Sequence, residues 1–373
     1  MMFMRRQAKK HEVGMFFPRN ARVFSVILIG ASLCCVLFFL ARASAASPQA
    51  ARNGRALRVA LLLEHEDDQS WSALLRRGLD RAGQEFSLHV EVLKASSGEE
   101  QTSLFRKAAG EFDLVLVGSA RFHEILRDNA ANYRRTLFGC VDAGIRAPNV
   151  MCVTFADEQG AYLAGAAAAM LPARRGLSGV NGGKTLGWLA GEDTSAQRSL
   201  LNGFTEGARL IDPETRVING ISGSSNGEGR AGEETRRLLE QGAEVIVLAA
   251  GRGNIPALEL VRERGVYIVG LDENQASVPP GRALTSIIRR ADKAVYDIIS
   301  LAAAGRFRGG EIVVYDLKNR GVDIADVFNG APGPERRPLL EDVRRRIGEL
   351  REEISSGGIR VQSLRDRTLC DCL

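Results

Sequence analysis

Short apolar segments alternate with amphipathic segments along most of this chain, and no other feature of the sequence limits the fold as strongly. The apolar segments have strand length and are almost continuously apolar, as strands are in a parallel sheet covered on both faces. We predict strands at Leu57–Leu63, Leu88–Leu93, Leu114–Val117, Thr136–Val141, Val150–Phe155, Thr185–Ala190, Val217–Ile221, Val245–Ala249 and Val266–Gly270.

The intervening segments have the periodicity of helices that cover a sheet. Nine such strands are too many for one compact sheet of this kind, so the sequence predicts an α/β fold with two doubly wound parallel-sheet lobes. We predict helices at Ser70–Ala82, Glu99–Ala109, Phe122–Asn129, Glu158–Met170, Ala196–Leu210, Gly229–Gln241, Ile255–Arg264, Ala291–Ala304 and Glu335–Ile354.

The N-terminal segment predicts export. Basic residues precede an apolar run from Val23 to Ala41, and Ala43–Ala45 has the small-x-small pattern of a signal-peptidase site. Because the run is 19 residues long, an uncleaved membrane anchor is the alternative; Cys34 makes only a weak lipidation site. We interpret residues 1–45 as a signal peptide or anchor and residues 46–55 as a linker, so the body is expected to be extracytoplasmic.

The net charge of +5 belongs to this leader rather than to the body. The first 45 residues hold seven of the 50 basic residues and one of the 45 acidic residues. The remaining chain therefore has a net charge of −1, and we expect no nucleic-acid partner.

The residue types that support catalysis are scattered. The four histidines lie on separate elements, and no P-loop motif is present. Cys140 and Cys152 lie in predicted strands without the spacing of zinc ligands; we expect buried free thiols, with a disulfide as the alternative. We therefore expect no enzyme activity, no cofactor and no metal.

Polar or glycine residues follow several apolar strands at the point where each strand ends. In VYIVGLDENQ, residues 266–275, a buried run leads directly into Asp272. Ligands of open parallel α/β sheets bind beyond the carboxyl ends of the strands. These strand exits, the residues directly after each strand, therefore predict that the strand ends of two sheets face one cleft. The other exits are residues 64–68, Gly118 with Ser119, Asp142, and residues 251–254.

Side chains at these exits have the chemistry of a binding site. Carboxylates of Asp68, Asp142 and Asp272 can each accept two hydrogen bonds, as a polyol or amide edge requires. Arg289 can donate a planar fork, and Trp71 can stack on a flat ring. The alternatives are a core tryptophan and solvated loop acids.

Six segments in fixed order carry a resemblance to a known family, and they run through most of the body: residues 149–170, 184–193, 200–217, 240–254, 266–275 and 284–299. From about Leu57 to Val361 the chain resembles the basic membrane protein family, the extracytoplasmic nucleoside-binding proteins that include purine nucleoside receptors.

The resemblance implies a type I periplasmic-binding fold, with two lobes joined by three crossovers, a hinge and a ligand cleft. On this basis we assign residues 56–155 and about 287–315 to the first lobe. Residues 156–286 and about 316–361 form the second, and residues 362–373 a tail.

The resemblance also implies a binding site. Asp68 and Trp71 match the family's first loop, although both of its asparagines are lost. Asp272 matches the aspartate that binds ribose, and Arg289 stands where the family has lysine. Arg252 places a bulky cation in the glycine turn. The predicted ligand-binding residues are Asp68, Trp71, Gly118, Ser119, Asp142, Gly251, Arg252, Asp272 and Arg289.

These features together predict a monomeric receptor that captures a nucleoside-like small molecule, a purine nucleoside first, for an ABC-type importer permease. A sensory module for a membrane signalling protein is the main alternative, and a nucleoside hydrolase is less compatible with the scattered histidines. Arg252 and Arg289 also raise the hypothesis of a different, anionic ligand.

Overall fold

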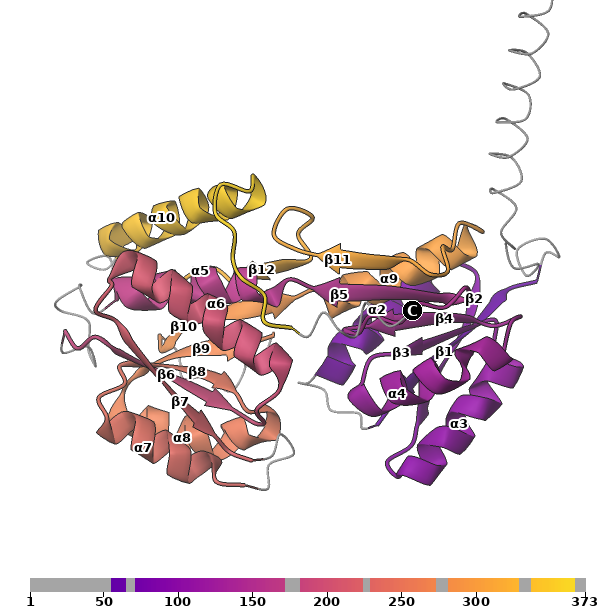
Figure 1. The fold of residues 1–373 in the computed structure, drawn as a ribbon, viewed down its shortest axis with the longest axis horizontal. Helices are drawn as coiled ribbons and strands as arrows, with labels where there is room; N and C mark the ends of the chain where they lie inside the picture. Colours follow the sequence, from indigo (N-terminus) through magenta and orange to yellow (C-terminus); the bar gives the residue numbers. More distant parts are fainter. Residues whose placement is uncertain are drawn as a thin grey trace, which may run out of the picture. The chain divides into compact units, whose positions relative to one another are not determined.

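A computed structural model describes residues 55–64, 71–171, 182–223, 229–272, 281–328 and 337–365. These residues form two six-stranded sheets with helices packed against them (Figure 1). The strand pairs are parallel except for one, between β10 and β12. This confirms the predicted α/β fold. The predicted leader and Asp68 lie outside the described residues.

The first sheet has the strand order β11-β5-β4-β3-β1-β2. Its strands are β1 (Leu57–Leu63), β2 (Leu88–Lys94), β3 (Leu114–Val117), β4 (Leu137–Val141), β5 (Val150–Phe155) and β11 (Ile312–Tyr315). With them we group as the first lobe the helices α2 (Trp71–Glu85), α3 (Gly98–Glu111), α4 (Ala120–Asn129) and α9 (Ala291–Ala303), and the 3-10 turn η2 (Ala130–Asn132).

The second sheet has the corresponding order β12-β10-β9-β8-β6-β7. Its strands are β6 (Thr185–Ala190), β7 (Arg216–Ile221), β8 (Val245–Ala249), β9 (Tyr267–Leu271), β10 (Ala283–Arg289) and β12 (Val322–Ile324). The second lobe also contains the helices α5 (Asp157–Met170), α6 (Ser195–Ile211), α7 (Ala231–Glu240), α8 (Asn254–Arg264) and α10 (Arg337–Ser355), and the 3-10 turn η3 (Gly251–Gly253).

The chain passes between the two sheets three times: after β5, after β10 and after β11. The boundary expected at about residue 287 lies inside β10, which pairs with β9 in the second sheet, so this crossover follows Arg289. Strands β10, β11 and β12 were not among the nine strands predicted. The last two are short, with four and three residues, and β11, unlike the equally short Leu114–Val117, is not a fully buried run.

Helices α5 and α6 pack at backbone distance because glycines line their contact. A Cβ atom at Gly207 would lie 1.9 Å from the carbonyl oxygen of Tyr162, and one at Gly165 would lie 2.0 Å from that of Phe204. Such separations are far below van der Waals contact, so only glycine fits at either position. The helix that follows the first crossover is thus in direct contact with its neighbour.

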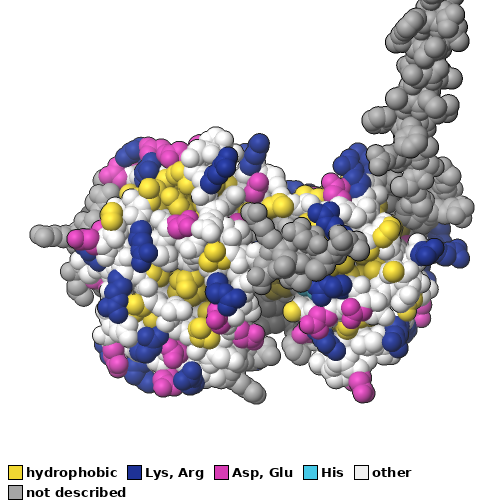
Figure 2. Space-filling view, in the orientation of Figure 1, with side chains coloured by type: hydrophobic (Ala, Val, Ile, Leu, Met, Phe, Trp, Pro, Cys, Tyr) yellow, Lys and Arg dark blue, Asp and Glu magenta, His cyan; other side chains and the backbone are white. Residues whose placement is uncertain are grey.

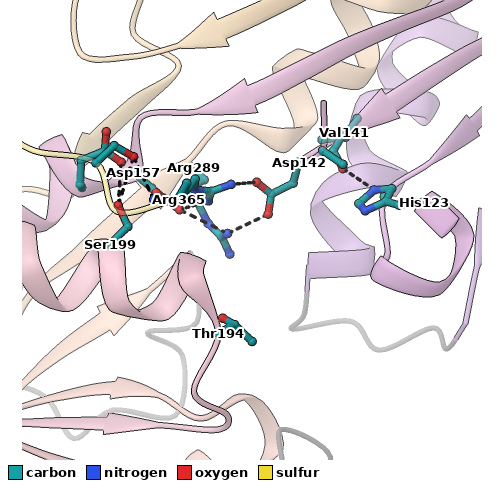
Figure 3. Close-up of polar contacts among 12 residues, drawn as sticks. His123, Val141, Asp142, Asp157, Thr194, Ser199, Arg289 and Arg365 are labelled. Atoms are coloured by element: carbon teal, nitrogen blue, oxygen red, sulfur yellow. Dashed lines mark hydrogen bonds and ion pairs between the residues drawn. The ribbon is translucent and has the colours of Figure 1, made fainter. Parts of the chain in front are cut away.

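Cys140 and Cys152 are register partners on β4 and β5, and both are free and buried. The prediction of buried free thiols is confirmed. His123 is also buried, and its Nε2 donates to the carbonyl oxygen of Val141 at 2.9 Å (Figure 3). No helix among the described residues is both long enough and apolar enough to span a bilayer.

Candidate functional site

Asp142 and Asp272 occupy equivalent places in the two sheets. Each follows the third strand of its sheet order, β4 in one sheet and β9 in the other. Each backbone N–H donates to the neighbouring crossover strand, at 2.8 Å to the carbonyl oxygen of Val153 and at 2.7 Å to that of Ile287. Both residues have left-handed backbones, with φ of 72° and 60°. Because this conformation is costly for residues other than glycine, it persists only where the surroundings fix it, as they often do at functional sites.

Arg289, the last residue of β10, joins these two carboxylates. Its Nε and Nη2 donate to the two oxygens of Asp272 at 3.0 and 2.7 Å. Its Nη1 donates to Asp142 at 3.4 Å (Figure 3). The Arg289 side chain is only 12% exposed. A two-pronged contact of this kind fixes the guanidinium plane as well as its position.

Trp71, at the start of α2, closes one side of this cluster. The Arg289 guanidinium carbon lies 4.4 Å from the centre of the indole ring, within the range of a cation–π interaction. The indole N–H donates to the carbonyl oxygen of Gly118 at 2.7 Å. The hydroxyl oxygen of Ser119, the next residue, is buried and has no hydrogen-bond partner within the described ranges.

Two further residues belong to the cluster, and neither was predicted from the sequence. Arg365 donates through Nη1 to Asp142 at 2.8 Å and through Nη2 to Asp157 at 2.5 Å. The Asp157 side chain is fully buried at the start of α5, and Arg289 lies 3.8 Å from it. An acid in the first turn of a helix is ordinary, and Arg365 stands in an arginine-rich segment, so neither residue carries a sequence signal of its own.

The cluster holds three carboxylates and two guanidinium groups. Burial raises the pKa of Asp142, but Arg365 and Arg289 outweigh it and hold that pKa below its ordinary value. The pKa of Asp157 is raised, because its burial outweighs the same two arginines. Burial, together with the charge of Asp157, raises the pKa of the neighbouring Glu158 to about 7.

Gly251 and Arg252 are not brought into this cluster by any contact within the described residues. They form the turn η3 after β8, and both are exposed. A depression of about 730 Å³ lies elsewhere, at the start of α3. Its lining contains none of the predicted site residues: Ser97, Gly98, Glu99, Thr102, Ser103, Arg106 and Arg121. We take the aspartate–arginine cluster as the candidate site, because side chains from both sheets converge there.

Two linked doubly wound sheets with polar side chains at their strand exits define the fold of periplasmic-type solute-binding proteins. A solute-binding protein of an ABC transporter system from Aeropyrum pernix K1 shares this fold, with a TM-score of 0.71 and 24% identity over 84% of this chain and 95% of that chain. The chain belongs to the Bmp family, described as ABC transporter substrate-binding protein PnrA-like, whose model matches residues 57–363.

Two proteins illustrate what this chain is similar to in sequence. An uncharacterized lipoprotein of Pyrococcus horikoshii is 27% identical over 291 residues, which cover 74% of this chain and 70% of that protein. The ABC transporter nucleoside-binding protein BmpA of Lactococcus lactis is 25% identical over 281 residues, which cover 69% of this chain and 78% of that protein.

Proposed function

We propose that this protein is an extracytoplasmic receptor that captures a nucleoside-like small molecule, a purine nucleoside first, and delivers it to the permease of an ABC importer. Membership of a substrate-binding family supports the general role. The nucleoside-binding relative and the lipoprotein relative support the ligand class and the location. The observation that carries the proposal is the link that Arg289 makes between Asp272 and Asp142.

The chemistry of this cluster suits a ligand rich in hydroxyl groups. A carboxylate that is held in place by a two-pronged arginine keeps free lone pairs, and Asp272 can use them to accept from two neighbouring hydroxyls. The aromatic face of Trp71 beside it can take the flat surface of a base. Capture requires no covalent step; in this proposal, closure of the two lobes over the ligand is the signal to the permease.

An anionic ligand fits the same cluster less well. The Arg289 charge is already matched by the carboxylates of Asp272 and Asp142. Arg252, the other cation in that hypothesis, is exposed on a separate turn. An added phosphate would therefore meet carboxylates first, and like charges at this distance repel.

A thermal-shift screen of the purified protein with nucleosides, free bases, nucleotides and sugars tests the proposal. A ligand at one hundred times its Kd adds about 2.7 kcal/mol of stability, a rise of a few degrees in Tm for a protein of this size. We expect inosine, adenosine or guanosine to raise Tm, and Asp272→Asn to abolish the rise. Asp128→Asn, on the exposed face of α4, is the matched control. A rise with nucleotides and none with nucleosides would refute the ligand class.

A further inference from the structure

The segment from Ile359 to Arg365, which we call the strap, runs from α10 along the second lobe. Figure 1 shows it in yellow, leaving α10 and crossing α6. The backbone N–H of Ile359 donates to the carbonyl oxygen of Glu353 at 3.0 Å, and the side chains of Ile359 and Val361 pack against the core of the second lobe. The start of the strap is therefore fixed to the second lobe.

The end of the strap is fixed to α6 by two polar side chains. Asn202 donates to the carbonyl oxygen of Gln362 at 3.3 Å, and the backbone N–H of Leu364 donates to the hydroxyl of Ser199 at 3.0 Å. Ser199 is completely buried, and the hydroxyl of Ser363 lies 3.3 Å from it. The buried hydrogen bond between Leu364 and Ser199 therefore limits where the side chain of the next residue, Arg365, can reach.

Arg365 extends from this anchored strap to the first lobe. Its guanidinium lies between Asp142, which ends β4 of the first sheet, and Asp157, at the start of α5 (Figure 3). The Arg365 side chain is 22% exposed, and Asp157 is fully buried. Because a buried carboxylate is costly without a cation, this pair is more than a solvated surface contact.

We propose that the strap is a latch between the lobes, in which Arg365 is a positioning residue that holds Asp142 against the second lobe. Separating the lobes would require the strap to leave Ser199 or Arg365 to leave Asp142. The latch also sets the direction of the Asp142 carboxylate, since one oxygen faces Arg365 and the other faces Arg289. The inference concerns the chain without ligand and is independent of which molecule binds.

Hydrogen exchange of the full chain without ligand tests the latch. In Arg365→Ala we expect about tenfold faster exchange in two separate segments, the strap and the first-lobe loop 142–149, as the loss of a charge-assisted hydrogen bond implies. The exchange rates of Arg365→Lys should fall between those of Arg365→Ala and the unmutated protein, because the ammonium group is a point charge and cannot hold two carboxylates as a planar guanidinium does. Arg360→Ala, on an exposed residue of the same strap, should leave the loop unchanged.

Chemical rescue makes the test specific for the missing guanidinium. Guanidinium chloride at low millimolar concentration should slow exchange of loop 142–149 in Arg365→Ala but not in the unmutated protein, with equal sodium chloride as the reference. Faster exchange of the strap without any change in loop 142–149 would overturn the latch, because the strap would then act on the second lobe alone. Absence of rescue would overturn the assignment of Arg365 as the bridging group.

Discussion

The buried Glu158 gives this protein a pH-dependent stability that one substitution should remove. Glu158 lies on α5 with 5% of its surface exposed, next to the carboxylate of Asp157 and 3.5 Å from the hydroxyl of Ser199. Its pKa is raised from 4.5 to about 7, first by burial and then by Asp157. Because the folded protein binds this proton more tightly than the unfolded chain, Glu158 favours folding at low pH. That contribution is complete below about pH 4.5 and is lost as the pH rises to about 7.

The size of the effect follows from the shift. At 1.36 kcal/mol for each pKa unit, the change from 4.5 to about 7 corresponds to on the order of 3 kcal/mol, as an upper bound. Glu158→Gln keeps the shape of the protonated side chain and removes its titration. The variant should therefore be as stable as the unmutated protein near pH 4, and more stable by up to about 3 kcal/mol at pH 8.

Urea unfolding of both proteins at several pH values between 4 and 8 gives the free energy of unfolding and hence the difference curve. Glu233→Gln, at an exposed position on α7, is the control and should give a nearly flat difference. A difference between Glu158→Gln and the unmutated protein that stays constant with pH, or that favours the unmutated protein at pH 8, would refute the reasoning.

Two further predictions follow from the packing. Gly207→Ala should lower the free energy of unfolding by about 3 kcal/mol, since its Cβ would lie 1.9 Å from the Tyr162 oxygen. Thermal unfolding measures this, and Gly232→Ala, whose nearest neighbour would be 3.7 Å away, should be tolerated. Cys140 and Cys152 should react with a thiol reagent only after unfolding, with the labelled peptides located by mass; rapid labelling of the native protein would contradict their burial.

Strand positions could be predicted closely wherever a continuous apolar run ends at a glycine or polar residue. The segments Leu114–Val117 and Thr185–Ala190 have the same bounds in the structure as in the prediction, because both are mostly buried and each lies between a charged residue and a glycine. The strand β10 was not predicted, because Thr285 and Ser286, two buried polar residues, interrupt its apolar run.

The centre of the candidate site was predictable for a topological reason. Asp142 and Asp272 each follow a strand of a different sheet, and ligands of such sheets bind beyond the carboxyl ends of the strands, so two sheets that share one cleft bring these residues together. Arg365 could not be found in this way. Its partner carboxylates lie 223 and 208 residues earlier in the chain, and no periodicity or motif encodes a contact over that separation. Gly251 and Arg252 also follow a strand and were predicted in the site, but they make no contact with the cluster within the described residues.

The glycine-lined contact between α5 and α6 has a mechanical consequence. Two helices whose backbones touch cannot slide past one another or rotate separately, because neither has side chains that could yield at the contact. Helix α5 begins two residues after β5, at the first crossover, and α6 carries Ser199, to which the strap is bound. A rotation of the backbone at Ala156 would therefore move α5, α6 and the strap bound to α6 together, as one rigid unit.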